Sequence, residues 1–133
     1  MAISGSPEGR RWVQFDTAGT DAISFANFIT SVLDDLEPGT PGNRKCFIMD
    51  NLISHHNPLT LTEILAAGHR FVFRAPFWPV DGPIEYVFNT IEMALSYRMY
   101  EIRTVDEIDA HLRAIVRGMP NFLNCFTNVG CNN

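Results

Sequence analysis

"KCFIMDNLISHHN", residues 45–57, places a short apolar run directly before a carboxylate, an amide and two histidines. The apolar residues, 46–49, are too few for a typical helix, and a segment rich in Pro and Gly, residues 37–43, precedes them. This pattern predicts a strand of a parallel sheet, buried on both faces. Asp50 then stands at the carboxyl end of the strand, where open α/β sheets gather their ligands.

The segments before this strand predict a first strand and a first helix. Residues 10–19, RRWVQFDTAG, alternate weakly and are rich in aromatic and β-branched side chains, which is typical of a strand. In residues 24–36, apolar side chains recur at spacings of three and four, which predicts an amphipathic helix with Ser24 as its N-cap. A β-α-β order therefore leads to Asp50.

The segments after it continue the alternation. The expected elements are a helix from the capping-box pair Thr60 and Glu63 to Gly68, a strand in residues 70–76, a helix introduced by Pro83, and a last helix from the capping box of Thr104 and Glu107 to Gly118. The tail, residues 121–133, fits neither pattern clearly. The order β-α-β-α-β-α-α predicts α/β architecture with parallel strands joined by right-handed crossovers.

Length and composition set limits on the kind of protein. A chain of 133 residues with 46% hydrophobic residues predicts one domain over residues 1–133, with residues 1–10 flexible. It has no long apolar run and no signal-peptide pattern, so we expect no membrane partner and a nuclear or cytoplasmic protein that is not secreted. Three cysteines without zinc-site spacing predict reduced thiols. The net charge of −5 means that nucleic acid could bind only through a local basic patch.

A second carboxylate, Glu85, follows in FWPVDGPIEYVF, residues 77–88. Glu85 begins a polar stripe on a predicted helix whose other side is apolar; the stripe continues with Asn89, Glu92 and Ser96. Mg²⁺ and Mn²⁺ prefer such oxygen ligands. If this helix packs beside the strand that ends at Asp50, the two carboxylates could hold one cation.

Together these residues resemble the catalytic core of mariner-type DDE transposases, which are ribonuclease H-like DDE endonucleases. The resemblance rests on the apolar strand ending in Asp50-Asn51, the histidine at position 55, the FWPVDGPIE segment, and the 34 residues that separate Asp50 from Glu85. It extends from about Arg11 to the last helix. It implies an incomplete ribonuclease H-like fold with about three mainly parallel strands and flanking helices.

The resemblance also implies roles. Asp50 and Glu85 match the second and third acidic ligands of Mg²⁺ or Mn²⁺ and would be catalytic. Asn51, His55 and Trp78 would lie behind these ligands or near DNA. The implied activity is metal-dependent DNA strand cleavage and transfer, as in DNA integration by a transposable element, with DNA as partner.

The chain departs from the family pattern at several positions. No residue matches the family's first aspartate, and Asp16 is a candidate to replace it. Gly82 stands where the family usually has Asn, and Glu92 stands near a position that is usually basic. We therefore expect impaired cleavage. Without the family's first strands, residues 12–16 could pair in parallel with residues 46–50, or else the exposed edge could bind another chain.

Other interpretations stay open. The chain could be a non-catalytic interaction module that binds a second copy or a full-length transposase, or a decayed remnant of a transposase. Asp50 and Asn51 could simply form a turn. His55 and His56 could form a zinc pair with Cys46, although adjacent histidines point in different directions. Phe77 and Trp78 could pack against the sheet instead of stacking on a base.

Overall fold

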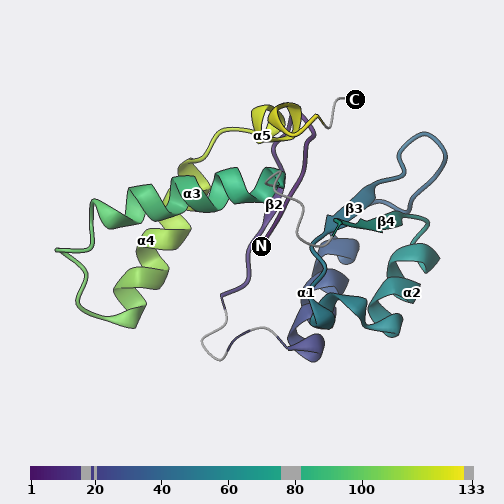
Figure 1. The fold of residues 1–133 in the computed structure, drawn as a ribbon, viewed down its shortest axis with the longest axis horizontal. Helices are drawn as coiled ribbons and strands as arrows, with labels where there is room; N and C mark the ends of the chain where they lie inside the picture. The colour runs from purple at the N-terminus through teal and green to yellow at the C-terminus, as the bar shows by residue number, and fades with distance from the viewer. Residues whose placement is uncertain (16–18, 20, 76–81, 131–133) are drawn as a thin grey trace. The chain divides into compact units, whose positions relative to one another are not determined.

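A computed structural model describes residues 1–15, 19, 21–75 and 82–130 (Figure 1). The chain forms two compact units: unit 1 comprises Met1–Phe15 and Pro79–Asn133, and unit 2 comprises Asp16–Trp78. Its described part is mixed α/β, with five α-helices and two small sheets. The expected sheet of about three mainly parallel strands is wrong in this part, because one two-stranded sheet is parallel and the other is antiparallel. No helix among the described residues is long and apolar enough to cross a membrane.

Unit 2 contains the strand predicted before Asp50. Strand β3 (Cys46–Met49) pairs in parallel with β4 (Arg70–Phe73), so that Cys46 lies opposite Arg70 and Met49 opposite Phe73. The chain connects these strands through the short 3-10 helix η1 (Ile53–His56) and the α-helix α2 (Pro58–Ala66). Helix α1 (Ala22–Asp34) precedes β3. The predicted strands around residues 46–49 and 70–73 are therefore confirmed.

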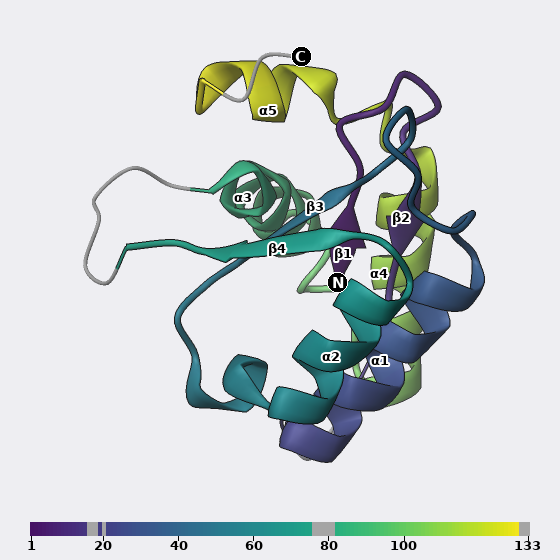
Figure 2. The ribbon, with the colours of Figure 1, turned by 90° about the vertical axis from the view of Figure 1, so that its right-hand side faces the viewer.

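Within the described residues of unit 2, helices cover one face of the β3–β4 sheet. Helices α1 and α2 lie together on that face (Figure 2), where Met49 is buried and Phe47 is partly buried. On the other face Ile48 and Val72 are 41% and 48% exposed. The expectation that β3 is buried on both faces is thus wrong, because successive side chains of a strand point to opposite faces and unit 2 has helices for one of them.

The core of unit 2 joins α1 and α2 to the covered face of the sheet. Its buried members are Phe25, Ile29, Met49 and Ile64, and partly buried Phe28, Leu33, Phe47, Leu61, Phe71 and Phe73 pack around them. Aromatic rings supply half of this set, and each buries a large apolar area. The predicted apolar face of the first helix is confirmed, since Phe25, Ile29 and Val32 are buried.

The N-caps of the first two helices are not the predicted ones. Helix α1 is capped by Asp21, whose carboxylate accepts from the Ser24 amide at 2.7 Å, so the prediction of Ser24 as cap is wrong. Helix α2 is capped by Asn57, with Pro58 at its first position. Both helices start earlier than predicted. In each, an earlier polar side chain accepts a hydrogen bond from a backbone amide two or three residues further on and so serves as the N-cap.

The predicted capping box at the start of α2 is therefore also wrong. Thr60 lies inside the helix and is fully buried. The carboxylate of Glu63 instead accepts a hydrogen bond from the Thr30 hydroxyl of α1 at 3.1 Å. The bond between Thr30 and Glu63 thus holds α2 against α1, and neither Thr60 nor Glu63 marks the beginning of α2.

Unit 1 contains the three remaining helices, α3 (Pro83–Ser96), α4 (Val105–Gly118) and α5 (Leu123–Asn128). Pro83 is the first residue of α3, as predicted. The Thr104–Glu107 capping box at the start of α4 is present in both directions, and α4 ends at Gly118. Helix α3 packs against both α4 and α5.

The strand predicted in residues 10–19 is shorter than expected and has a different partner. Strand β2 (Arg11–Trp12) pairs antiparallel with β1 (Ala2–Ile3), so the predicted parallel pairing with residues 46–50 is wrong. Arg11 fixes this arrangement: its guanidinium donates to the carbonyls of Val116 and Met119 at 2.5 and 2.8 Å. These bonds add side-chain donors at the end of α4, where the Val116 carbonyl also accepts from the Met119 amide.

His69, between α2 and β4, predicts a pH dependence of stability. It is 3% exposed, and its burial, followed by the charges of Lys45 and Arg44, lowers the pKa of the imidazole below its ordinary value. As the pH falls below about 6.5, the unfolded chain takes up this proton before the folded one does, so His69 should lower the free energy of unfolding. An NMR titration of the His69 ring protons should give a midpoint below that of a free histidine peptide. A midpoint above the peptide value would contradict the prediction.

Candidate functional site

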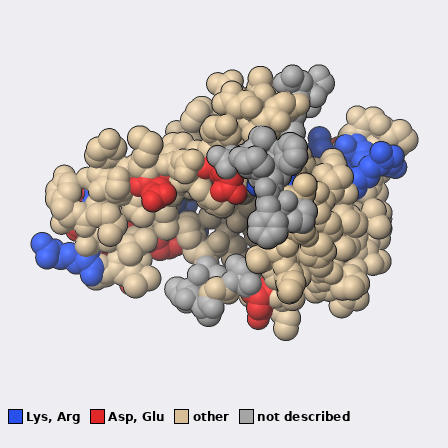
Figure 3. Space-filling view, in the orientation of Figure 1, with Lys and Arg blue, Asp and Glu red and all other residues tan. Residues whose placement is uncertain are grey.

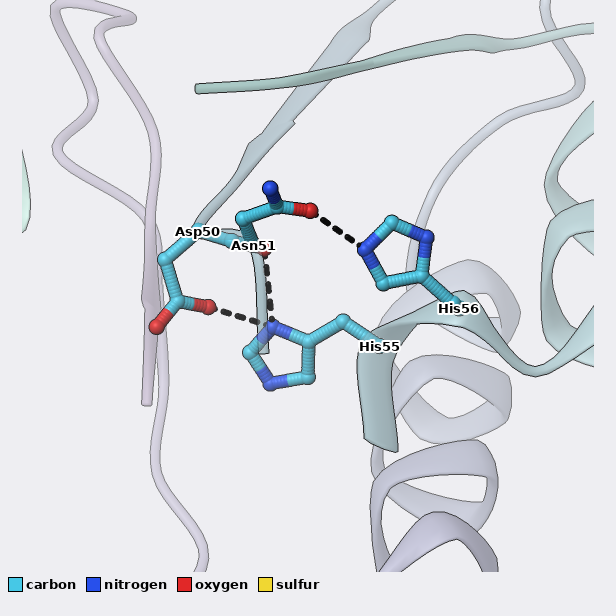
Figure 4. Close-up of polar contacts among 4 residues, drawn as sticks. All are labelled: Asp50, Asn51, His55 and His56. Atoms are coloured by element: carbon cyan, nitrogen blue, oxygen red, sulfur yellow. Dashed lines mark hydrogen bonds and ion pairs between the residues drawn. The ribbon is translucent and has the colours of Figure 1, made fainter. Parts of the chain in front are cut away.

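The site begins where β3 ends. Asp50 directly follows Met49, and one carboxylate oxygen accepts from His55 Nδ1 at 2.5 Å (Figure 4). The backbone carbonyl of Asp50 also lies 3.4 Å from this nitrogen. His55 reaches Asp50 because η1 turns the chain back toward the strand end. The structure thus brings together two of the residues that the sequence singled out.

A second pair lies beside the first. The Asn51 side-chain oxygen is 2.6 Å from His56 Nε2 (Figure 4). The adjacent histidines extend in different directions, as predicted, and each meets the residue five positions before it. The turn between β3 and η1 is therefore closed by two parallel side-chain contacts.

Both imidazole rings also stack on aromatic side chains of unit 2. His55 lies against Phe25 and His56 against Phe73, each with ring centroids 4.0 Å apart. Phe25 belongs to α1 and Phe73 to β4, so the two histidines connect the strand end to two other elements of the unit. Stacking of this kind stabilises by roughly 0.5–1.5 kcal/mol per pair of rings.

The Asp50 carboxylate is available to a ligand. Its side chain is 55% exposed, whereas that of His55 is only 17% exposed. Figure 4 shows the second carboxylate oxygen directed away from His55. One exposed carboxylate oxygen, oriented by a neighbouring imidazole, suits a hard cation such as Mg²⁺ or Mn²⁺, for which carboxylate and water oxygens are the preferred ligands.

Glu85 belongs to unit 1. It is the third residue of α3, half-buried, and its amide donates to the Gly82 carbonyl at 3.0 Å. Gly82 is the N-cap of the helix and offers no side-chain cap. A carboxylate in the first turn interacts favourably with the helix dipole. Asn89, Glu92 and Ser96 are exposed, as expected for the polar stripe.

Some residues of the predicted site fall outside the described part of the chain. These are Asp16, the candidate to replace the family's first aspartate, and Phe77 and Trp78, the candidates for base stacking. The other acid near the start of the chain, Asp21, caps α1.

The zinc site considered as an alternative has no matching cluster in the described residues. Within residues 1–15, 19, 21–75 and 82–130, no group of three or more His, Cys, Asp or Glu side chains is close enough to hold one metal ion. His56 contacts Asn51, and Cys46 is an exposed residue at the other end of β3. Of the two carboxylates that the sequence assigned to Mg²⁺ or Mn²⁺, Asp50 belongs to unit 2 and Glu85 to unit 1.

The role of the histidines was only partly predicted. The sequence suggested His55 as a residue behind the ligands, but it did not suggest the pairing of His56 with Asn51. A signal was present: Asp50 and Asn51 precede His55 and His56 by the same five residues. One turn of a 3-10 helix after a short connection returns residues with this spacing to the strand end.

The chain was compared with protein-family models, with curated proteins and with solved structures, and none of the three comparisons found a match.

Proposed function

We propose that the chain is a domain derived from DDE-type transposases, related to metal-dependent DNA strand cleavage and transfer, with Asp50 and Glu85 as retained metal ligands. The observation that carries the proposal is the position of Asp50, which follows β3 at the carboxyl end of a parallel strand pair. Glu85, 34 residues further along, lies in the first turn of a helix. A carboxylate after a strand and another on a helix are what the family resemblance implies.

The residues of this chain suit one part of that chemistry. Asp50 would bind the cation through its exposed oxygen, while His55 holds the carboxylate at the strand end. Glu85 would supply a second oxygen ligand from α3. A bound Mg²⁺ or Mn²⁺ activates water and stabilises the leaving oxygen in phosphodiester cleavage. Because no counterpart of the family's first aspartate is identified here, we expect the chain by itself to cut DNA slowly.

Calorimetric titration of Mn²⁺ tests the proposal. Asp50→Ala and Glu85→Gln should each weaken Mn²⁺ binding by roughly tenfold or more, because each removes a charged oxygen ligand. Asp34→Asn and Glu92→Gln are matched controls that remove exposed charges from α1 and α3. They should leave the affinity unchanged.

The same variants should then be incubated with labelled duplex DNA and Mn²⁺. Nicking by the wild-type chain that is lost in both ligand variants would support cleavage activity. If Mn²⁺ does not bind the wild-type chain, or if the control variants lose binding equally, the proposal of a retained metal site is wrong.

One observation favours a second candidate, a non-catalytic interaction module that binds a second copy of the chain. On the face of the β3–β4 sheet opposite α1 and α2, Ile48 and Val72 are exposed side by side, since the two are register partners. Self-association measured by sedimentation that persists in Asp50→Ala but is lost in Ile48→Asn would support this function. A chain that stays monomeric at high concentration would exclude self-association.

A further inference from the structure

A second chemical feature lies at the opposite end of the same sheet from Asp50. There the first residues of the two parallel strands, Cys46 and Arg70, lie side by side, and the Arg70 amide donates to the Lys45 carbonyl at 2.9 Å. Arg44 and Lys45 come directly before β3. Three cationic side chains are thus attached to neighbouring backbone positions at the amino ends of β3 and β4.

These residues surround a surface hollow of about 380 Å³, lined by Pro41, Arg44, Lys45, Cys46 and Arg70. Its volume is at the lower end of the range for small-molecule sites. No carboxylate among the described residues lines it. Figure 3 shows Lys and Arg side chains gathered at the upper right, over the part of unit 2 that bears these strands.

The positive charges in the hollow are not neutralised within the described residues. The ion pairs Asp50–His55 and Asp109–Arg113, within the described residues, do not involve Arg44, Lys45 or Arg70. The chain as a whole is acidic, with a net charge of −5, so this group of three cations is a local basic patch on an acidic protein.

The loop that carries Arg44 and Lys45 is held in place by the backbone. The Gly39 amide donates to the Ala67 carbonyl at 2.8 Å, and the Asn43 side-chain oxygen accepts from both the amide and the hydroxyl of Thr40. The Arg44 amide also donates to the Thr40 carbonyl. Because the loop is already ordered, binding a ligand would cost less conformational entropy.

His69 lies close to the same cations. The pKa of its imidazole is lowered by burial and then by the charges of Lys45 and Arg44. Its Nδ1 lies 3.4 Å from the amide of Lys45, one of the residues that line the hollow. A bound anion would offset these charges.

We propose that this hollow binds a phosphate group, held by Arg44, Lys45 and Arg70. Arginine suits the site because its planar guanidinium presents paired donors to phosphate oxygens, and lysine adds a point charge. The site is separate from Asp50 and does not depend on the proposed metal site. The phosphate could be free or part of a nucleotide, and the experiment separates these two sources.

Cys46 provides a reporter inside the proposed site, because its thiol is exposed among the three cations. Two disulfide reagents are compared, the dianionic 5,5′-dithiobis(2-nitrobenzoate) and the neutral 2,2′-dipyridyl disulfide. For each, the rate of labelling Cys46 is divided by its rate with a small thiol in solution. This ratio should be higher for the dianionic reagent. Peptide mapping by mass spectrometry follows this residue separately from Cys125, which is partly buried and whose thiol pKa is raised by burial.

Arg70→Gln should lower the rate with the anionic reagent by roughly three- to tenfold and leave the rate with the neutral reagent unchanged, because only the anion is attracted by the field. Inorganic phosphate should protect Cys46 from the anionic reagent in the wild-type chain. Arg98→Gln, which removes an exposed charge from unit 1, is the matched control and should change neither rate.

Phosphate binding is then measured directly from amide shifts in NMR spectra, with inorganic phosphate and with thymidine 5′-monophosphate. Shifts at Lys45, Cys46 and Arg70 that saturate, and that are lost in Arg70→Gln, would support the site. Tighter binding of the nucleotide would identify a nucleotide as the source, and equal binding would identify free phosphate. Equal labelling by both reagents in wild type and variant, or no saturable shift with either ligand, would overturn the proposal.

Discussion

Gly68→Ala is expected to destabilise unit 2 by roughly 3 kcal/mol or more, the largest effect we expect from a single added methyl group. Gly68 follows α2 with φ +82°, a conformation that side chains with a Cβ rarely adopt. It completes the end of the helix, since its amide donates to the Leu65 carbonyl and the next amide donates to the Ile64 carbonyl. This is the Schellman arrangement that favours glycine.

The added methyl group would also collide with backbone. A Cβ at Gly68 would meet the carbonyl oxygen of Gly39, and a Cβ at Gly39 would meet the carbonyl of Gly68 and, at 2.6 Å, His69 Nδ1. Neither backbone can yield easily, because the Gly39 amide is bonded to the Ala67 carbonyl. The two glycines therefore form a close crossing of the loop before β3 with the end of α2.

Gly42→Ala is the matched control, because Gly42 lies in the same loop and a Cβ there would have no neighbour within 4 Å. It should leave the free energy of unfolding within about 0.5 kcal/mol of wild type. Urea denaturation followed by circular dichroism compares the three chains. Equal stability of Gly68→Ala and Gly42→Ala would show that the crossing does not constrain unit 2.

Local sequence patterns predicted those elements whose signals lie within the element itself. The apolar run of residues 46–49, the Pro83 start of α3 and the Thr104–Glu107 capping box of α4 were all found where expected. The capping box joins residues three apart and Pro83 acts in the first turn of its own helix, so these two signals are local. The apolar run indicated β3 by its length and by the Pro- and Gly-rich segment before it.

Features that depend on distant partners could not be read in this way. The partner of β2 is β1, a two-residue strand, and the bonds from Arg11 to the end of α4 span more than a hundred residues. The burial of β3 depended on how many faces the helices cover, which no pattern inside β3 reveals. Nearby polar residues could each have capped the first helix, and the structure has Asp21 as the N-cap instead of Ser24.

The candidate site shows the same division. The position of Asp50 after β3 followed from the apolar run, but the bonds of Asp50 and Asn51 to the two histidines depend on the turn made by η1. The basic hollow was not predicted, because Arg70 is distant in sequence from Arg44 and Lys45. Only the parallel register of β3 and β4 places the three together.

Ile64→Ala is expected to lower the free energy of unfolding of unit 2 by about 2–5 kcal/mol. The Ile64 side chain has no exposed surface, and it packs in the core with Phe25, Ile29 and Met49. Truncation removes buried methyl groups and leaves a cavity between α2, α1 and the sheet. Since whole domains are commonly stable by only about 5–15 kcal/mol, a loss of this size should move the urea midpoint strongly.

Leu65→Ala is the matched control, because Leu65 is the next residue of the same helix and is 55% exposed. Both substitutions replace a large aliphatic residue in α2 by alanine, so they share the same change in helix propensity to within a few tenths of a kcal/mol. Leu65→Ala should therefore cost much less. If the two variants unfold at the same urea concentration, Ile64 does not lie in a packed core.

The same variant links the core of unit 2 to the candidate site. Met49 contacts the core and directly precedes Asp50, and Phe25 carries the ring on which His55 stacks. A cavity at Ile64 should therefore loosen both supports of the Asp50–His55 pair, and the His55 ring protons should lose the upfield shift that stacking on Phe25 causes. In Leu65→Ala this shift should be retained. An unchanged His55 spectrum in a measurably destabilised Ile64→Ala would show that η1 holds the pair without help from the core.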